Sequence, residues 1–366
     1  MFRVKRSESK SRDPLSAVKE IHSGLGNEKL DSIIAFYSSS YDQDILASAL
    51  IDTFDCKIIA CSSAGEIGSH FLKDGIVAAG LPSSHFKSHG VDIRSVSELK
   101  KSVFDDLQGK VAGLSDKSVF ALSLIDGLSV QEEKLLAQLN PVLGDIPLIG
   151  GSAGDNLEFK ETTVFCDGEL RSDSATLTLI ETDLPFKVFQ LQHFLPTEVD
   201  LVITAADPST RTVYEIDGGV AAEEYARVLG MKVEDLSPEV FSKNPVMLQI
   251  GDSWYVRSIQ KALPDGGLAF YCAIDEGIPL TLARGEDLVM NLERKVKELS
   301  SEFSSVAFSL GCDCILRRLE IEAHGLCSDI ERLFSELNLI GFHTYGEHFN
   351  SIHINQTLTG VVVGNG

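Results

Sequence analysis

Three histidines near the C-terminus have residue types and spacing that could bind a metal, namely His343, His348 and His353. The same stretch holds a turn-like Thr-Tyr-Gly-Glu sequence at residues 344–347 and a polar Asn-Gln-Thr step at residues 355–357. A neutral imidazole is a common metal ligand, so His348 and His353 are candidate ligands. The alternative is a structural turn followed by a strand, which makes this stretch a framework that lines a pocket.

The strand expected over residues 352–358 alternates apolar and polar side chains. Because successive side chains of a strand point to opposite faces, this alternation predicts His353 and Asn355 on one face. Together with Tyr345 in the preceding turn, they are candidate cofactor-binding residues.

His193 lies at the end of an apolar strand, between residues 189–192 and the Phe-Leu-Pro sequence at 194–196. An imidazole held neutral in an apolar wall is what an axial haem ligand needs. A core histidine that hydrogen-bonds to the backbone is an equally weighted interpretation. His193 is nevertheless the first candidate for an iron ligand, with Phe194 beside it.

Arg317 and Arg318, followed by Glu320, could bind an anionic group such as a carboxylate or a porphyrin propionate. A solvated helix face is an equally weighted explanation. Cys61 could be a nucleophile, but nothing near it in the sequence supplies a base or a positive charge, so a buried structural thiol is favoured. The sequence contains no phosphate-binding glycine loop, zinc-protease motif or Gly-x-Ser-x-Gly motif, and we therefore expect no enzymatic activity.

The elements that must position these residues follow a pattern that occurs three times. A strand and a helix lead to a second strand that stops at a small residue, a glycine and an acid, over residues 32–66, 118–155 and 305–347. The pattern predicts related α/β units. Ordinary turn chemistry is the favoured explanation for the first two glycines, Gly65 and Gly154. The alternative is that these turns bring backbone amides and an acid to a ligand-binding crevice.

Each copy is followed by another strand candidate, at residues 76–81, 162–166 and 352–358. Between the second and third copies, strand-like segments form a meander, interrupted by a helix over residues 221–229. A domain boundary is expected within residues 184–200. Helix signals also begin at Asp13-Pro14, where an N-cap residue precedes proline.

Composition limits the classes of function. The chain has 366 residues, of which 43% are apolar, and a net charge of −22. Such a charge argues against nucleic acid and against anionic membrane surfaces as partners. No apolar run is long enough to span a membrane, and the basic N-terminus lacks the apolar core of a signal peptide, so a cytoplasmic location is expected. The seven cysteines are scattered and do not form a disulfide framework.

Three motifs in the same order resemble the FIST family, a bacterial sensory module with FIST N and FIST C parts. They are Cys-Ser-Ser-Ala-Gly-Glu-Ile at 61–67, Gly-Gly-Ser-Ala-Gly-Asp-Asn at 150–156, and Gly-Phe-His-Thr-Tyr-Gly-Glu at 341–347 with Asn-Gln-Thr at 355–357. The resemblance implies a two-domain FIST fold of the α/β (mixed α+β) class, with repeated strand-helix-strand units and mixed sheets. We therefore expect a flexible N-terminal arm over residues 1–12, a FIST N domain over residues 13–190 and a FIST C domain over residues 191–366.

Within that family, the chain is similar to the nitric-oxide-sensing haemoprotein branch (NosP), which partners a histidine kinase. The residues that carry this likeness are Tyr41-Asp42, residues 192–196, Asp207-Pro208 with Arg211, and residues 313–320. The resemblance implies non-covalent haem b, His193 as the axial ligand and nitric oxide bound at the iron.

The expected function is thus a haem-based sensor of nitric oxide that regulates a partner histidine kinase and downstream biofilm and cyclic-di-GMP signalling. The candidate haem-binding residues are His193, Phe194, Arg317, Arg318, Tyr345, His353 and Asn355, with His348 and His353 as weaker iron ligands. The alternative is a FIST-type receptor that binds a small organic ligand, such as an amino acid, without haem. Whether the chain forms a homo-oligomer is left open.

Overall fold

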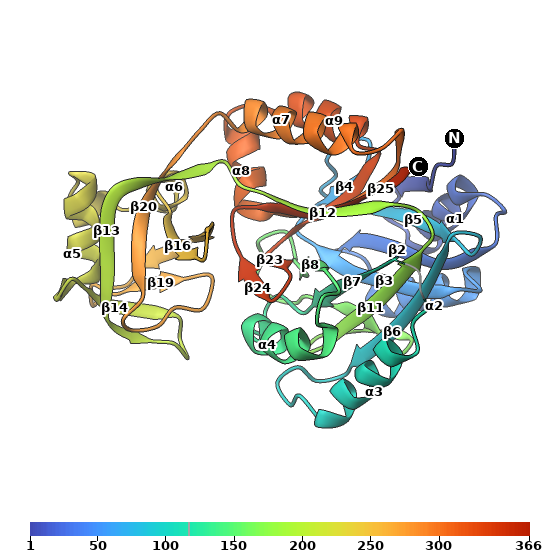
Figure 1. Cartoon of the computed structure of the whole chain (residues 1–366), viewed down its shortest axis with the longest axis horizontal. Coiled ribbons are helices and arrows are strands. Elements are labelled where there is room, and N and C mark those ends of the chain that lie inside the picture. Colours follow the sequence, from blue (N-terminus) through green and yellow to red (C-terminus); the bar gives the residue numbers. More distant parts are fainter. Residues whose placement is uncertain (116–117) are drawn as a thin grey trace. The chain divides into compact units, whose positions relative to one another are not determined.

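The computed structural model describes residues 1–115 and 118–366, whose strands form four sheets (Figure 1). The chain divides into two compact units. Unit 1 contains Met1–Leu191, Leu292–His353 and Leu358–Gly366, and unit 2 contains Gln192–Asn291 and Ile354–Thr357. The sheets contain both parallel and antiparallel pairs, which confirms the predicted α+β class with mixed sheets.

The three predicted copies share one topology. The first copy consists of β2 (Leu30–Ser38), α2 (Gln43–Thr53) and β3 (Lys57–Ser63). The second consists of β7 (Ser118–Ile125), α4 (Glu132–Leu143) and β8 (Leu148–Ser152). The third consists of β21 (Ser305–Cys314), α8 (Ile315–Ala323), α9 (Cys327–Glu336) and β22 (Leu339–Thr344). In each copy the two strands are parallel. The first strand also pairs antiparallel with a return strand, β5 (Ile76–Pro82), β11 (Ala175–Thr182) or β25 (Leu358–Asn365). The repeat read from the sequence is therefore a real structural repeat.

Three details of the repeat differ from the prediction. The return strand of the second copy is β11, whereas residues 164–166 form β9 (Val164–Cys166) beside β3. The third copy has two helices rather than one. The strand predicted over residues 352–358 is divided into β24 (Ile352–Ile354) and β25, because Gln356 has a φ of 50° that interrupts an extended strand. His353 and Asn355 consequently do not share one strand face.

Three of the sheets belong to unit 1. Their orders are β1-β5-β2-β3-β9-β10, β24-β23-β8-β7-β11-β6 and β12-β25-β21-β22-β4. The remaining strands in these sheets are β1 (Lys5–Ser9), β4 (Glu66–Ile67), β6 (Phe86–Ile93), β10 (Glu169–Arg171), β12 (Phe186–Leu191) and β23 (Glu347–Phe349). Because β1 pairs antiparallel with β5, the prediction of a flexible arm is wrong for residues 5–9.

The three copies surround one shared apolar core. Its members include Phe36 of β2, Phe120 of β7 and Phe308 of β21, each at most 1% exposed. The other face of β2 packs against α1 (Pro14–Leu25) and α2, and the outer face of β7 packs against α4 and α3 (Lys101–Ala112). Helix α1 begins as predicted, since Asp13 caps it by accepting a hydrogen bond from the Ser16 amide at 2.9 Å.

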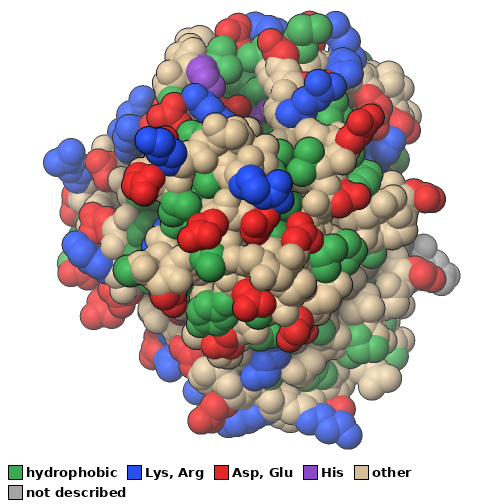
Figure 2. Space-filling view, turned by 90° about the vertical axis from the view of Figure 1, so that its left-hand side faces the viewer, with side chains coloured by type: hydrophobic (Ala, Val, Ile, Leu, Met, Phe, Trp, Pro, Cys, Tyr) green, Lys and Arg blue, Asp and Glu red, His purple; other side chains and the backbone are tan. Residues whose placement is uncertain are grey.

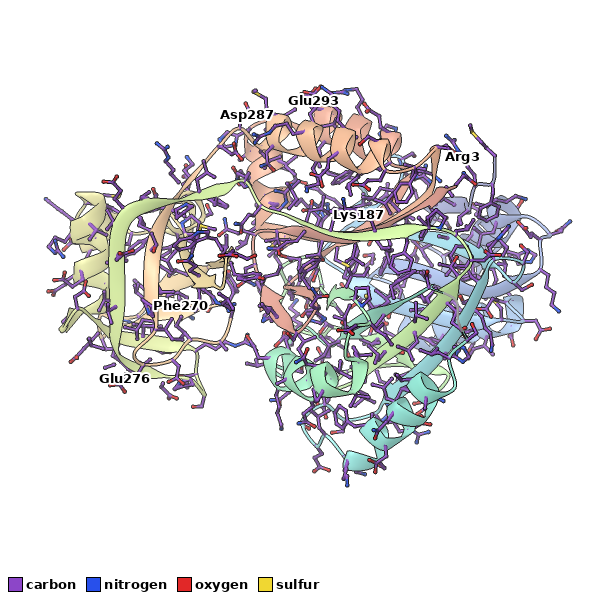
Figure 3. All side chains as sticks on the ribbon, viewed as in Figure 1. Arg3, Lys187, Phe270, Glu276, Asp287 and Glu293 are labelled. Atoms are coloured by element: carbon purple, nitrogen blue, oxygen red, sulfur yellow. The ribbon has the colours of Figure 1, made fainter. Side chains whose placement is uncertain are left out.

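Unit 2 is built on one strongly bent sheet with its own apolar core. Its strands are β13 (Phe194–Asp207), β14 (Thr212–Ile216), β15 (Gly219–Val220), β16 (Val246–Ile250), β17 (Ser253–Arg257), β18 (Ile259–Ala262), β19 (Leu268–Phe270) and β20 (Pro279–Gly285). The helices are α5 (Ala221–Leu229), a 3₁₀ turn at Val233–Asp235 and α6 (Pro238–Lys243). Phe270 is buried in this core, whereas Glu276 lies in an exposed turn before β20 (Figure 3).

The chain leaves unit 1 after Leu191, within the expected boundary region, and returns to it at Leu292 in α7 (Leu288–Ser301). The expected FIST C division of residues 191–366 therefore does not coincide with one compact unit. The third copy of the repeat packs with the first two because its inner strand faces belong to their core.

No helix among the described residues is long and apolar enough to cross a membrane. Figure 2 shows a face on which acidic, basic and apolar side chains are interspersed. The chain has a net charge of −22, but its acidic side chains do not form one continuous patch on that face.

Candidate functional site

The turns that end the first and third copies bind each other through the backbone. The Ala64 amide donates to the His343 carbonyl at 2.8 Å, and the His343 amide donates to the Gly65 carbonyl at 2.7 Å. These bonds bring the loop after β3 against the end of β22. Residues that are far apart in the sequence thus form one local structure.

The turn of the second copy joins both of them. The Gly154 amide donates to the Ser62 carbonyl at 3.1 Å, and the Ser152 amide donates to the Gly346 carbonyl at 2.8 Å. We call residues 62–66, 152–155 and 343–347 the turn junction. The turns therefore meet at one place, as the alternative interpretation of the repeat requires, and whether they form a ligand-binding crevice stays a prediction.

Close packing explains why the junction needs glycine. A Cβ on Gly65 would lie 1.6 Å from Nη1 of Arg318, and a Cβ on Gly346 would lie 2.0 Å from Nε2 of His353. Gly65 also has a φ of +126°, which other residues rarely adopt. At Gly154 a Cβ would lie 2.6 Å from a backbone nitrogen of the first turn. Ordinary turn chemistry is therefore only part of the reason for these glycines.

The acid of the first turn, Glu66, is buried, and the described residues hydrogen-bond only part of its carboxyl group. Glu66 is fully buried, and its Oε1 accepts a hydrogen bond from the Ser63 hydroxyl at 2.6 Å. Its Oε2 has no hydrogen-bond partner among the described residues. Burial raises the pKa of Glu66 to about 7, although the nearby Arg318 acts in the opposite direction.

The acid of the second turn has a structural role. Asp155 accepts hydrogen bonds from the amides of Phe159 and Lys160, at 2.9 and 2.6 Å, and from the Tyr345 hydroxyl. The Tyr345 ring stacks on Phe159 at 4.9 Å between centroids. Tyr345, a predicted cofactor-binding residue, therefore holds the loop after β8 in place.

Buried charges line the junction at the start of α8. Arg317 donates to Asp313 at 2.6 Å, and both side chains are 0% exposed. Arg318 donates to the Ala64 carbonyl at 2.5 Å and to Glu322 at 2.9 Å. The explanation of these arginines as a solvated helix face is therefore wrong.

His343 lies in the same place, with Nδ1 3.7 Å from Oδ2 of Asp313. Neither ring nitrogen makes a hydrogen bond of ordinary geometry with the described residues. Burial, and then the positive charges of Arg318 and Arg317, lower the pKa of His343 well below its usual range, so the ring is neutral. We call Glu66, Asp313, Arg317, Arg318 and His343 the turn cluster.

A surface loop, residues 68–73, covers His343. The Phe71 ring meets the His343 ring edge-on, with centroids 4.9 Å apart. Glu331 of α9 holds the loop by accepting a hydrogen bond from the Phe71 amide at 2.8 Å, and it contacts Nδ1 of His70 at 3.1 Å. Phe71 itself is only partly buried, so this part of the cover over His343 reaches the surface.

The two other C-terminal histidines face the start of α4. His348 shares a hydrogen bond with the Ser123 hydroxyl at 2.7 Å, and Nδ1 of His353 lies 2.8 Å from Oε1 of Glu133. The rings of His348 and His353 are 6.0 Å apart. Burial lowers the pKa of His348 to about 3, so this imidazole is neutral at pH 7.

His193 lies in unit 2, 1% exposed and against the ring of Phe194 at 4.2 Å between centroids. Its carbonyl accepts a hydrogen bond from the Glu286 amide at 2.7 Å. The Cδ2 and Nε2 atoms border Gly285 of β20, where an added Cβ would already be in van der Waals contact, at 3.7 and 3.9 Å. The edge of the ring that would bind iron thus faces a neighbouring strand.

Each unit by itself holds only part of the predicted haem-binding set. His193, Phe194 and Asn355 belong to unit 2, whereas Arg317, Arg318, Tyr345 and His353 belong to unit 1. Within unit 1, Arg317 and Arg318 lie in the turn cluster, and His353 lies with His348.

Cysteine chemistry is not favoured at the candidate nucleophile. Cys61 is fully buried in the shared core, and burial raises the pKa of its thiol well above the usual value. A protonated thiol is a poor nucleophile. This agrees with the interpretation of Cys61 as a structural residue.

Sequence reasoning missed Asp313, Glu132 and Glu133 as candidate site residues. Asp313 is the next-to-last residue of β21 and Arg317 lies in the first turn of α8, so their ion pair depends on the strand-to-helix turn and had no helical spacing to signal it. Glu132 and Glu133 gave no specific signal, because acids are common in the first turn of a helix.

Comparison with known proteins supports the assignment by resemblance. The model of the FIST N domain matches residues 31–219, and that of the FIST C domain matches residues 221–350. An uncharacterized protein of Methanocaldococcus jannaschii is 22% identical over 415 aligned positions, which cover 98% of this chain and 78% of that protein.

Proposed function

This chain belongs to the FIST family, and from that premise we propose that it senses a small polar organic molecule, such as an amino acid, at the turn cluster. Its FIST N and FIST C domains indicate a sensory role in signal transduction. The proposed protein is a receptor without catalytic activity of its own.

Incomplete hydrogen bonding inside the turn cluster carries the proposal. Buried polar atoms nearly always have a partner, because leaving one unpaired costs about 1–3 kcal/mol. Glu66 Oε2 and the ring nitrogens of His343 lack such partners among the described residues, although both side chains are fully buried. A bound polar molecule would supply them.

The chemistry of the cluster suits a ligand with both a donor and an acceptor group. The Glu66 carboxylate accepts hydrogen bonds from an ammonium group, and the Arg318 guanidinium and a neutral His343 donate to a carboxylate. Arg318 lies close enough to Glu66 and to His343 to influence the charge of both. An amino acid carries the two complementary charges.

The loop over residues 68–73 gives the ligand a route and the protein a signal. Displacing Phe71 would open the cluster, and the same movement would strain the bonds from the loop to Glu331. A ligand shifts a conformational equilibrium only through different contacts with the two states. Here those contacts are with the loop and the start of α8.

The narrower resemblance implies haem b at His193, a residue that is 1% exposed. Gly285 borders the Cδ2 and Nε2 edge of the ring, and the Glu286 amide donates a hydrogen bond to the His193 carbonyl, so a porphyrin on Nε2 would need room beside β20. Nitric oxide sensing and control of a histidine kinase stay predictions that a haemin titration can test.

Calorimetric titration of the full chain with the common amino acids tests the proposal. We expect at least one to bind, and Glu66→Gln to weaken that binding by roughly tenfold or more, because it removes a charged hydrogen-bond acceptor. Glu158→Gln, at an exposed position, is the matched control and should bind like the wild type.

Two results would contradict the proposal: no binding by the wild-type chain, or equal binding by Glu66→Gln. A stoichiometric haem absorption band that shifts with nitric oxide and is lost in His193→Ala would instead support the haem sensor.

A further inference from the structure

Two carboxylates and an imidazole converge beneath the turn junction. Ligand atoms of Glu132, Glu133 and His353 all lie within 4.8 Å of one another. Glu132 and His353 are buried, at 3% and 2% exposure, and Glu133 is partly buried. Carboxylate oxygens and imidazole nitrogens at such separations could contact one ion together.

The surrounding fold positions Glu132 and His353. The Ser152 hydroxyl donates to Oε1 of Glu132 at 3.2 Å, which fixes one carboxylate. His353 turns its Nε2 onto Gly346, where a Cβ could not fit, and so presents Nδ1 to Glu133 at 2.8 Å. A bond such as that from Ser152 to Glu132, which orients a ligand from outside the site, is typical of metal centres.

His348 is an independent indication that a ligand is missing. It is 0% exposed, and Nδ1 is occupied by the Ser123 hydroxyl, so Nε2 points away from Ser123. Nε2 has no hydrogen-bond partner among the residues that the structure describes. The ring lies next to that of His353, with the centroids 6.0 Å apart and the ring planes at 77°.

We propose that Glu132, Glu133 and His353 bind one divalent first-row transition metal ion, such as Zn²⁺, beside the buried ring of His348. Mixed imidazole and carboxylate ligands suit these metals, whereas Mg²⁺ and Ca²⁺ prefer oxygen ligands alone. The ion would join the start of α4 to β24 and so brace the third turn of the junction. This site does not depend on the proposed amino-acid ligand.

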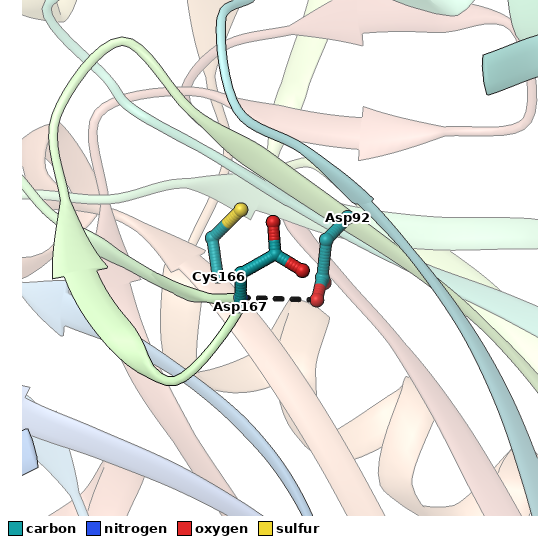
Figure 4. A group of neighbouring side chains, drawn as sticks. All are labelled: Asp92, Cys166 and Asp167. Atoms are coloured by element: carbon teal, nitrogen blue, oxygen red, sulfur yellow. Dashed lines mark hydrogen bonds between the residues drawn. The ribbon is translucent and has the colours of Figure 1, made fainter. Parts of the chain in front are cut away.

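A second group of potential ligands, Asp92, Cys166 and Asp167, lacks these features (Figure 4). Both carboxylates are exposed, Asp167 is engaged by Arg94, and Oδ2 of Asp92 accepts a hydrogen bond from the Asp167 amide at 3.1 Å. Burial raises the pKa of the Cys166 thiol to about 12, which disfavours the thiolate that binds metals. This group supplies a control position.

Titration of the chelator-treated full chain with Zn²⁺ and with Co²⁺ tests the proposal. We expect one ion per chain by calorimetry, and a Co²⁺ absorption spectrum that reports nitrogen and oxygen ligands. Glu133→Gln is nearly isosteric and partly exposed, and it should weaken binding by roughly tenfold or more. His353→Gln should do the same, and Asp167→Asn should leave binding unchanged.

Circular dichroism separates lost ligands from lost structure. The proposal is overturned if the wild-type chain binds neither metal, or if folded Glu133→Gln and His353→Gln variants both retain wild-type binding. If one of the latter two does not fold, the other variant and the wild-type Co²⁺ spectrum decide the question.

Discussion

Glu66 is an acid in the turn junction whose ionisation is made unfavourable by burial. Its carboxyl group is buried between Ser63 and Arg318, with one oxygen unpaired among the described residues. An ionised carboxylate in such surroundings is costly, so the neutral form is favoured up to a higher pH than in water. A site of this kind is stabilised when a cationic partner arrives.

The raised pKa of Glu66 predicts a specific pH dependence of stability. The folded pKa of about 7 exceeds the ordinary value of 4.5, so between these values the folded protein holds more protons than the unfolded chain. The free energy of unfolding must therefore fall as pH rises through this interval, by about 3 kcal/mol. Glu66→Gln does not titrate, and its stability relative to the wild type should rise by that amount.

Urea unfolding of both proteins at pH values from about 4 to 8 measures this difference. Glu158→Gln, exposed at the surface, controls for the loss of one charge. A stability difference between Glu66→Gln and wild type that does not vary with pH would show that Glu66 ionises normally in the folded chain.

At the scale of elements, α9 and the loop over residues 68–73 form a clamp. Glu331 is the only α9 side chain among the described residues for which we find hydrogen bonds to this loop, and the acceptor is charged. The loop itself has little regular structure and depends on such contacts. It should therefore open at a lower free-energy cost than the strands of unit 1.

Releasing the clamp should increase the motion of the loop without unfolding the sheets. We expect Glu331→Ala to speed amide exchange of residues 68–73 by roughly tenfold, because a hydrogen bond to a charged group is lost. Hydrogen exchange followed by mass spectrometry reads this segment separately from β3 and β5.

Glu336→Ala, on the same helix but paired with Arg332, is the control and should leave the loop unchanged. Equal loop exchange in wild type and Glu331→Ala would mean that Glu331 does not hold the loop.

At the scale of the molecule, one core joins parts of the chain that come before and after unit 2 in the sequence. Phe36 of the first copy stacks on Phe342 of the third, with centroids 4.3 Å apart. Strand β25, near the C-terminus, pairs with β12 and β21. Unit 1 is consequently not a contiguous domain.

This arrangement predicts that two fragments of the chain, residues 192–291 and 1–191, differ in cooperative folding when expressed separately. A fragment of residues 192–291 contains nearly all of unit 2 and should unfold cooperatively on heating, since it retains its own core. Residues 1–191 alone would leave the shared core exposed and should show no cooperative transition. Differential scanning calorimetry of each fragment measures this. Cooperative unfolding of the 1–191 fragment would contradict the shared core.

Local patterns predicted much of the secondary structure. The helix expected over residues 221–229 coincides with α5, and the cap at Asp13-Pro14 begins α1. The strand over residues 352–358 was predicted wrongly because the turn at Gln356 cannot be read from alternation alone. The sequence left open whether Arg317 and Arg318 bind an anion or face solvent. A helix pattern does not show which charged side chains another segment will cover.

The sequence by itself determined the threefold repeat and the FIST family, because glycine and acid at the ends of similar strands are local features. Only the tertiary structure decided which acids are buried and which lie close to other polar side chains. His353 and Glu133 are 220 positions apart and meet because two copies of the repeat pack together. Likewise, Glu66 reaches a pKa of about 7 only because the folded chain removes it from water. Proximity and burial are properties of long-range packing, and no short motif contains them.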